Sequence, residues 1–150
     1  MTELEHKIDR KGWPPGPWDG EPEDRAEWRH RGLPCLAVRS KLGQWCGYAG
    51  VPAGHPYYGI DRENVPVEVH GGLTYADKCA GPICHVPRPG ETDDVWWLGF
   101  DCGHFMDIQP GLSLPSEISE DWMTYKDLGY VAHEVEILAG QLMVLARTAG

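Results

Sequence analysis

Three histidines and one aspartate in the middle of the chain have side chains that can bind a metal or move a proton. They are His55, His70, Asp101 and His104. Imidazole nitrogens and carboxylate oxygens form the usual ligand set of zinc, and a carboxylate can instead orient an imidazole. The chain has no HExxH, no paired CxxC and no EF-hand loop. We therefore predict a site for a divalent metal such as zinc on His70, Asp101 and His104, with His55 as a fourth candidate ligand. This prediction requires that the fold bring these side chains together.

The stretch VWWLGFDCGH, residues 95–104, runs from an apolar segment into three of these polar groups. Side chains alternate along a strand, so it presents two faces. The first face, which we expect to be core, consists of Trp96, Leu98, Phe100 and Cys102. The second consists of Val95, Trp97, Gly99 and Asp101. On this second face Gly99 leaves space between the aromatic ring of Trp97 and the carboxylate of Asp101, which predicts the wall of a pocket. Gly103 allows a sharp turn, so His104 could point back toward Asp101.

The segment HGGLT, residues 70–74, supplies further candidate ligand contacts. If the strand that ends at His70 neighbours residues 95–102, His70 and Asp101 meet across the sheet. HGGLT matches neither common phosphate-loop pattern, but its backbone N–H groups could bind an anion, and nearby aromatic rings could stack a nucleobase. The predicted ligand-binding residues are His55, Tyr58, His70, Gly71, Gly72, Thr74, Trp97, Asp101 and His104.

The five cysteines are odd in number and unevenly spaced, which fits reduced thiols better than a disulfide framework. Cys35 and Cys46 are expected to be small buried hydrophobic residues. Cys79 and Cys84 with His85 form a C-x4-C-H group, although zinc sites generally use a tighter, paired spacing. Cys102 lies beside His104, but alternation turns it toward the core, which disfavours nucleophilic catalysis.

Composition limits the classes of partner. The 150 residues suffice for one domain with a real core, and the net charge of −10 disfavours binding to duplex DNA or RNA. No stretch reaches the roughly 20 apolar residues of a membrane helix, and the N-terminus lacks the apolar segment of a signal peptide. We therefore expect a cytoplasmic protein without a membrane partner.

The first third of the chain predicts an arm followed by a hairpin. Residues 1–32 are expected to form a Pro/Trp-rich arm, in which Trp13 and Trp18 lie across the domain or a partner chain, and a short helix from Pro22 to His30. Residues 33–150 are expected to form a single domain. It begins with two strands, 33–40 and 44–51, joined around Leu42-Gly43.

The middle of the chain predicts short extended segments separated by loops. Residues 52–64 read as a loop, 65–70 as a strand, 73–76 as extended chain and 77–94 as a long excursion. Residues 95–102 are the clearest strand, and residues 105–123 read as mostly irregular chain.

The last element is an amphipathic helix over about residues 124–147, with Thr124 as its N-cap. Its apolar stripe consists of Leu128, Val131, Val135, Leu138, Leu142 and Leu145. We expect this stripe to pack on the domain's own sheet, although the heptad spacing also suits a homodimer seam. The predicted fold is α+β, a mainly antiparallel sheet with the C-terminal helix packed on it.

Four segments in this order resemble a group of short uncharacterised proteins of tailed phages and prophages. They are CGYAGVPAGHPYYG at 46–59, VHGGLTYA at 69–76, WWLGFDCGH at 96–104 and YKDLGYVAHEVEILAGQL in the helix. The resemblance implies an accessory protein made in the cytoplasm of an infected bacterium, where such proteins can sequester a nucleotide immune signal as counter-defence.

Three functions are therefore open. The first is binding of a small molecule or nucleotide, the second is a metal-dependent hydrolase that uses the His/Asp set to activate water, and the third is inhibition of a host protein through the acidic surface and the WPPGPW arm.

Overall fold

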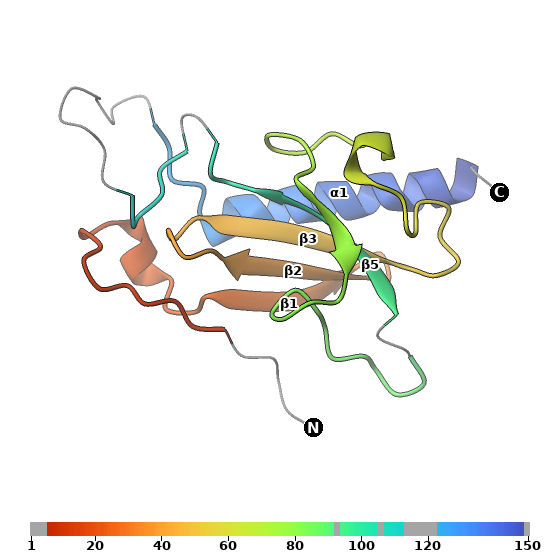
Figure 1. The fold of residues 1–150 in the computed structure, drawn as a ribbon, viewed down its shortest axis with the longest axis horizontal. Coiled ribbons are helices and arrows are strands. Elements are labelled where there is room, and N and C mark those ends of the chain that lie inside the picture. The colour runs from red at the N-terminus through yellow and green to blue at the C-terminus, as the bar shows by residue number, and fades with distance from the viewer. Residues whose placement is uncertain (1–5, 92–93, 105–106, 113–122, 149–150) are drawn as a thin grey trace.

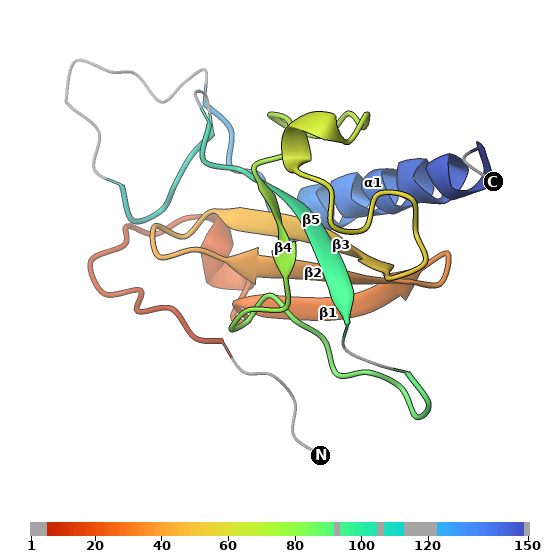
Figure 2. The same cartoon turned by 45° about the vertical axis from the view of Figure 1, so that its right-hand side comes forward.

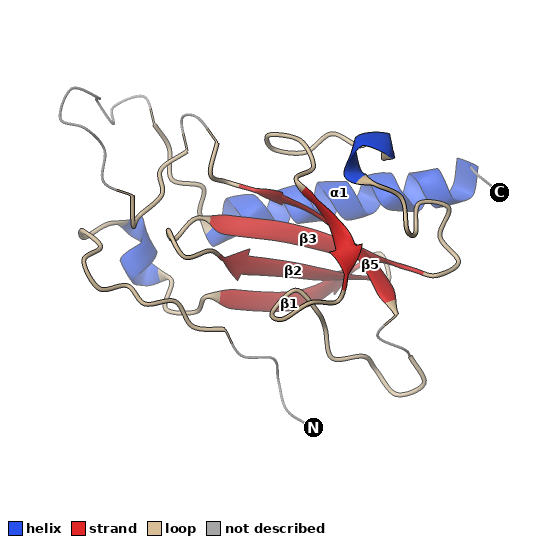
Figure 3. Ribbon diagram, in the orientation of Figure 1, coloured by secondary structure: helices blue, strands red, loops and turns tan. Residues whose placement is uncertain are grey.

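A computed structural model describes residues 6–91, 94–104, 107–112 and 123–148. These residues form one five-stranded antiparallel sheet in the order β1-β2-β3-β5-β4, with a long helix on one face (Figures 1 and 3). The strands are β1 (Arg25–His30), β2 (Leu33–Arg39), β3 (Trp45–Pro52), β4 (Tyr75–Lys78) and β5 (Val95–Asp101), and two short 3-10 turns are η1 (Pro17–Gly20) and η2 (Arg62–Asn64). The predicted α+β class, the β2–β3 hairpin and the β5 strand are confirmed. Most of the segment 105–123, which was predicted to be mostly irregular, lies outside the described residues.

Helix α1 (Leu128–Thr148) packs on the sheet through the predicted stripe. Val131, Val135, Leu138 and Leu142 are fully buried in one cluster with residues of β2, β3 and β5. Contrary to the sequence expectation, α1 is long and apolar enough to cross a membrane, by length and composition only. In this structure the centre of its apolar stripe, from Val131 to Leu142, is buried on the sheet. Its cap is Asp127 rather than Thr124, because the Tyr130 N–H donates to Asp127 Oδ1 at 2.8 Å.

Residues 25–30 form a strand, so the predicted helix from Pro22 to His30 is wrong. Arg31 and Gly32 both have positive φ, 52° and 85°, and close a two-residue turn that pairs β1 with β2. Ala26 and Trp28, two residues apart, pack against the helix-side core. The sheet therefore begins at Arg25, within the part of the chain that was assigned to the arm.

Residues 65–70 are extended but belong to no strand, so that prediction is also wrong. The backbone of this segment bonds to side chains of α1 instead of to a neighbouring strand. Gln141 accepts from the Glu68 N–H and donates to the Glu68 carbonyl, both at 2.8 Å, and Glu134 accepts from the His70 N–H at 3.0 Å. The neighbours of β5 in the sheet are instead β3 and β4, and β4 includes two residues of the predicted 77–94 excursion.

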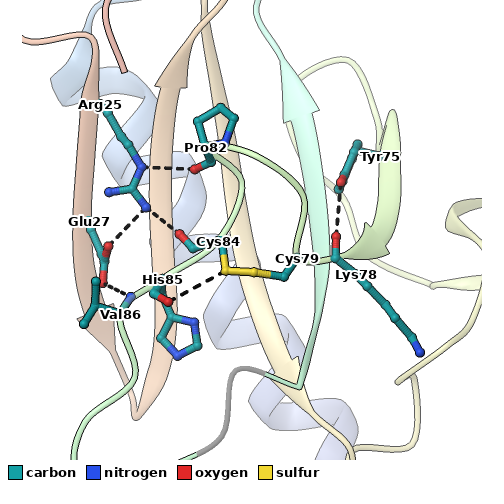
Figure 4. Close-up of a disulfide and its surroundings, with 9 residues drawn as sticks. All are labelled: Arg25, Glu27, Tyr75, Lys78, Cys79, Pro82, Cys84, His85 and Val86. Atoms are coloured by element: carbon teal, nitrogen blue, oxygen red, sulfur yellow. Dashed lines mark hydrogen bonds and ion pairs between the residues drawn. A yellow bond between two sulfur atoms is a disulfide. The ribbon is translucent and has the colours of Figure 1, made fainter. Parts of the chain in front are cut away.

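The second face of the sheet has its own core, formed by Leu36, Val38, Tyr48, Val95 and Trp97. Residues 79–91, which we call the strap, leave β4 and reach β1 across the face opposite α1 (Figures 1 and 4). Ile83 packs on this core, and the Arg25 guanidinium donates to the Pro82 carbonyl at 3.0 Å. The strap therefore completes a third layer of the domain.

Cys79 and Cys84 are joined by a disulfide within the strap, so the expectation of reduced thiols is wrong for this pair (Figure 4). Neither sulfur is a free thiol for the C-x4-C-H metal group that the spacing already disfavoured. Between them, Ala80 and Ile83 exchange two backbone hydrogen bonds of 3.0 Å around Gly81-Pro82. This local hairpin brings the two thiols together. Cys35, Cys46 and Cys102 are free.

The N-terminal arm lies across the end of the domain, as predicted. Trp18 is 6% exposed, and its ring packs edge-on against Tyr125 at 5.2 Å between centroids. Beneath it, the fully buried Arg39 guanidinium pairs with Asp24 at 2.9 Å and with Glu21 at 3.2 Å. Because Glu21 also accepts from the Leu128 N–H at 2.7 Å, this ion network ties the arm to the start of α1.

Candidate functional site

Six polar side chains converge where β5 ends and α1 begins. We call them the Asp107 cluster, and they are His70, Asp101, His104, Asp107, Lys126 and Tyr130. Figure 2 shows β5 running toward the end of the sheet beside the first turns of α1. The structure therefore unites His70, Asp101 and His104, the three residues that sequence reasoning assigned to a metal. It also adds three residues that sequence reasoning missed.

Asp107 is the centre of this cluster and is only 2% exposed. Its Oδ2 lies 2.7 Å from His70 Nε2 and accepts from the His104 N–H at 3.1 Å, while its Oδ1 lies 3.3 Å from Lys126 Nζ. The Asp107 N–H donates to the His104 carbonyl at 2.9 Å, which closes a tight turn after β5. A buried carboxylate needs such partners, because an uncompensated charge in the interior is costly.

His70 uses both ring nitrogens. Nε2 faces Asp107, and Nδ1 lies 2.8 Å from the Tyr130 hydroxyl. Both bonds are satisfied when the proton of a neutral ring sits on Nε2 and the Tyr130 hydroxyl donates to Nδ1. Burial, followed by the nearby carboxylate of Glu134, raises the pKa of Tyr130. Tyr130 therefore remains a protonated hydroxyl, and the residue is 37% exposed.

His104 forms the exposed part of the cluster. Its Nε2 lies 3.4 Å from Asp101 Oδ1, both side chains are about one-third exposed, and its ring centroid is 5.9 Å from that of His70. The ring packs so closely on Gly71 that a Cβ there would overlap it. Gly71 also has a φ of 69°, so two independent constraints favour glycine at this position. Gly71 thus shapes the site without offering a side chain.

A metal centre finds no support in this geometry. Within residues 6–91, 94–104, 107–112 and 123–148, no group of three or more His, Cys, Asp or Glu side chains could hold a metal ion. The carboxylate of Asp107 orients His70 instead, which is the alternative role that the sequence left open.

His55 lies elsewhere in the fold. Its Nε2 is 2.8 Å from the Leu142 carbonyl, its Nδ1 accepts from the Tyr57 N–H, and its side chain is buried. Leu142 is twelve residues beyond Tyr130 on α1, about 18 Å at 1.5 Å per residue. His55 therefore cannot join His70 and His104, and it acts as a link between the loop after β3 and the helix.

Tyr58 and Thr74 are also separated from the Asp107 cluster. Tyr58 donates to the Asp94 carboxylate, and its ring packs near Trp96 at 6.0 Å, toward the opposite end of β5 from Asp101. The Thr74 N–H donates to the Gly99 carbonyl at 2.8 Å, so its backbone extends the pairing of β4 with β5. Gly72, with a φ of 82°, completes the turn beside Gly71.

The predicted pocket wall on the second face of β5 is wrong. Trp97 is fully buried, with the His85 ring packed edge-on at 5.6 Å. The gap at Gly99 is filled by Tyr48, whose ring would overlap a Cβ at that position. This face therefore packs beneath the strap and offers no open site at Trp97.

The free thiols are poorly suited to act as nucleophiles. Burial raises the pKa of the Cys35 and Cys46 thiols to about 12, and burial also raises the pKa of Cys102, which is 1% exposed. Thiolates are therefore scarce near neutral pH.

A comparison of the chain with known protein families, curated proteins and solved structures finds no match. The site geometry is thus the basis for a functional proposal.

Proposed function

We propose that the protein binds a small polar ligand at the Asp107 cluster, through His104, the Tyr130 hydroxyl and the exposed edge of His70. The observation that carries this proposal is the buried Asp107 carboxylate, which holds His70 and Lys126 in one cluster with the partly exposed side chains of His104 and Tyr130. Groups oriented in this way bind a ligand without a large ordering cost.

The charges of the cluster indicate which part of a ligand would bind. Asp101 and Asp107 supply two carboxylates, whereas Lys126 supplies one ammonium group that already faces Asp107. Such a site favours N–H donors or a cationic group over a phosphate. A nucleotide, the ligand class suggested by the phage resemblance, would therefore place the amino group of its base on the cluster.

We further propose that such binding sequesters a nucleotide signal in the cytoplasm of an infected bacterium. Sequestration needs binding without turnover. The raised pKa values of the Tyr130 hydroxyl and of the Cys102 thiol disfavour these two groups as nucleophiles, which supports binding over covalent catalysis by either of them.

Isothermal titration calorimetry tests the proposal with a panel of nucleosides, nucleoside monophosphates and cyclic mono- and dinucleotides. We expect at least one compound to bind, with affinity reduced at least tenfold by Tyr130→Phe and by His104→Gln. The matched control is His133→Gln, an exposed imidazole on the same helix, which should leave affinity unchanged.

Absence of binding across the panel would contradict the nucleotide proposal. Chromatography of each bound compound after incubation should return it unchanged. Conversion of the compound, together with stoichiometric metal in elemental analysis of the purified protein, would favour the hydrolase instead.

A further inference from the structure

A groove lies beside the C-terminal half of α1, well away from the Asp107 cluster. It has a volume of about 410 Å³ and is lined by Arg31, Pro66, Gly140, Gln141, Val144 and Leu145. Three segments form it: the β1–β2 turn, the extended segment 65–70 and α1. Its size falls within the range of small-molecule sites in proteins.

The surface that lines the groove is mainly apolar. We call the position of Gly140 the floor of the groove, because the absence of a side chain there leaves space. Val144 is 51% exposed, although it lies on a helix whose other valines, Val131 and Val135, are fully buried. Gly140 is in the interior of α1, where glycine is less favourable than alanine. A Cβ there would meet only Arg31 Nε, at 4.0 Å, so packing does not require the glycine.

Arg31 has an unusual backbone conformation. Among the described residues it is the only non-glycine with positive φ, at 52°. A two-residue hairpin turn of this kind prefers Asn, Asp or Gly, and an ordinary side chain there is strained. This strained position holds the guanidinium side chain that borders the groove.

The charge of Arg31 has no partner within the described part of the chain. Five other arginines each pair with a carboxylate: Arg10, Arg25, Arg29, Arg39 and Arg62. Arg88 and Arg147, like Arg31, have no ion pair among the described residues, but neither of them lines the groove. Arg31 therefore places an uncompensated positive charge beside an apolar groove in a chain with a net charge of −10. The fork geometry of its guanidinium matches a carboxylate group.

We propose that this groove binds a small aliphatic carboxylate, with its head group on Arg31 and its tail along Pro66, Val144 and Leu145. The open floor at Gly140 gives the tail space. The proposal is independent of the ligand proposed for the Asp107 cluster.

An NMR titration of the full-length, 15N-labelled protein with octanoate tests this proposal. Octanoate should shift the amide signals of Gly140, Gln141 and Val144 in a saturable manner. The uncharged analogue 1-octanol should bind at least fivefold more weakly, because it lacks the carboxylate that pairs with Arg31.

Two variants locate the site. Arg31→Gln should weaken octanoate binding about tenfold, and Gly140→Leu, which fills the floor, should abolish it. Arg147→Gln is the matched control, because Arg147 is an exposed arginine on the same helix outside the groove lining, and it should bind as the native protein does. Circular dichroism and thermal unfolding check that each variant is folded.

Several results would overturn the proposal. These are equal affinity for octanoate and 1-octanol, unchanged affinity in the folded Arg31→Gln variant, and amide shifts confined to other regions. Sedimentation that showed a concentration-dependent dimer dissociated by Gly140→Leu would instead identify a second copy of the chain as the occupant, and would also overturn it.

Discussion

The imidazole of His70 and the carboxylate of Asp107 meet at 2.7 Å, although 37 residues separate them in the chain. The contact joins the turn before β4 to the turn after β5. It lies beneath the solvent-facing groups His104 and Tyr130, so it supports both the fold at this end of the sheet and the proposed site.

The first prediction concerns the charge of Asp107. Asp107→Asn would leave Lys126 and His70 facing a neutral amide in a buried position. We expect the free energy of unfolding to fall by about 3 kcal/mol, as when one partner of a buried ion pair is lost. Urea denaturation followed by circular dichroism measures this change.

Asp101→Asn is the matched control, because Asp101 is one-third exposed and its pairing with His104 is partly solvated. It should cost less than about 1 kcal/mol. Equal effects of the two substitutions would show that Asp107 is not the structural centre of the cluster.

The second prediction concerns the close packing of Gly99 and Tyr48. Gly99→Ala would place a methyl group inside the Tyr48 ring, so either the ring or β5 must shift. We expect a loss of about 2 kcal/mol in the free energy of unfolding, typical of overpacking. Gly54→Ala, at a site with nothing within 4 Å, should change it by less than about 0.5 kcal/mol.

A double-mutant cycle tests the cause. Adding Tyr48→Leu to Gly99→Ala should cost less than the sum of the two single changes, because the ring that clashes has gone. Strict additivity would mean that the glycine is required for another reason.

The elements that the sequence predicted well are those in which apolar residues recur at a regular spacing without interruption. The alternation in residues 95–102 and the three-and-four spacing in α1 each reflect one buried face, so β5 and α1 follow from their own residues. The faces of β5 were also correct. Trp97 was misplaced because the strap, which precedes β5 in the chain, folds back across this face of the sheet. The alternation within residues 95–102 does not show that another segment covers that face.

The failures have specific physical causes. Three of the six residues 25–30 are charged and one is a histidine. This polar composition obscures the period-2 pattern of Ala26 and Trp28, which both pack on the core. The alternation in residues 65–70 is real, since Val65, Val67 and Val69 pack on the core, but Gln141 and Glu134 replace the strand partner. Asp107 was missed because its role depends on a turn that begins at His104 and on His70 far away in sequence.

The third prediction concerns the disulfide of the strap. Thiol titration of the unfolded protein without reductant should detect three thiols, and five after reduction, because Cys79 and Cys84 are bonded and three cysteines are free. The folded protein should react slowly at pH 8, because burial raises the pKa of Cys35 and Cys46 to about 12.

Replacing both bonded cysteines tests the contribution of the link. The double variant Cys79→Ser with Cys84→Ser should lower the free energy of unfolding by roughly 2 kcal/mol, the expectation for so short a closed loop. Cys46→Ser serves as a single-thiol control with no covalent link to lose. Detection of five thiols before reduction would contradict the disulfide.

The fourth prediction concerns the pH dependence of the network around Arg39. Burial alone would raise the pKa of Glu21, but hydrogen bonds from Tyr125, the Leu128 N–H, Trp45 and Arg39 outweigh it and lower that pKa below its usual value. At Asp24, burial is likewise outweighed by the Ile8 N–H, Arg10 and Arg39. Because both folded-state pKa values lie below those of the unfolded chain, the stabilisation is present above the unfolded values and is lost as pH falls through the folded ones.

The free energy of unfolding should therefore decrease as the pH is lowered from about 5 to about 3, as measured by urea denaturation at each pH. Glu21→Gln should lower stability at pH 7 and make this acid limb shallower, because one of the two carboxylates no longer takes up a proton on unfolding. Glu63→Gln, at a side chain that is 68% exposed, should reproduce the native profile. An acid limb that is equally steep in Glu21→Gln would show that the network around Arg39 does not set the acid stability of the fold.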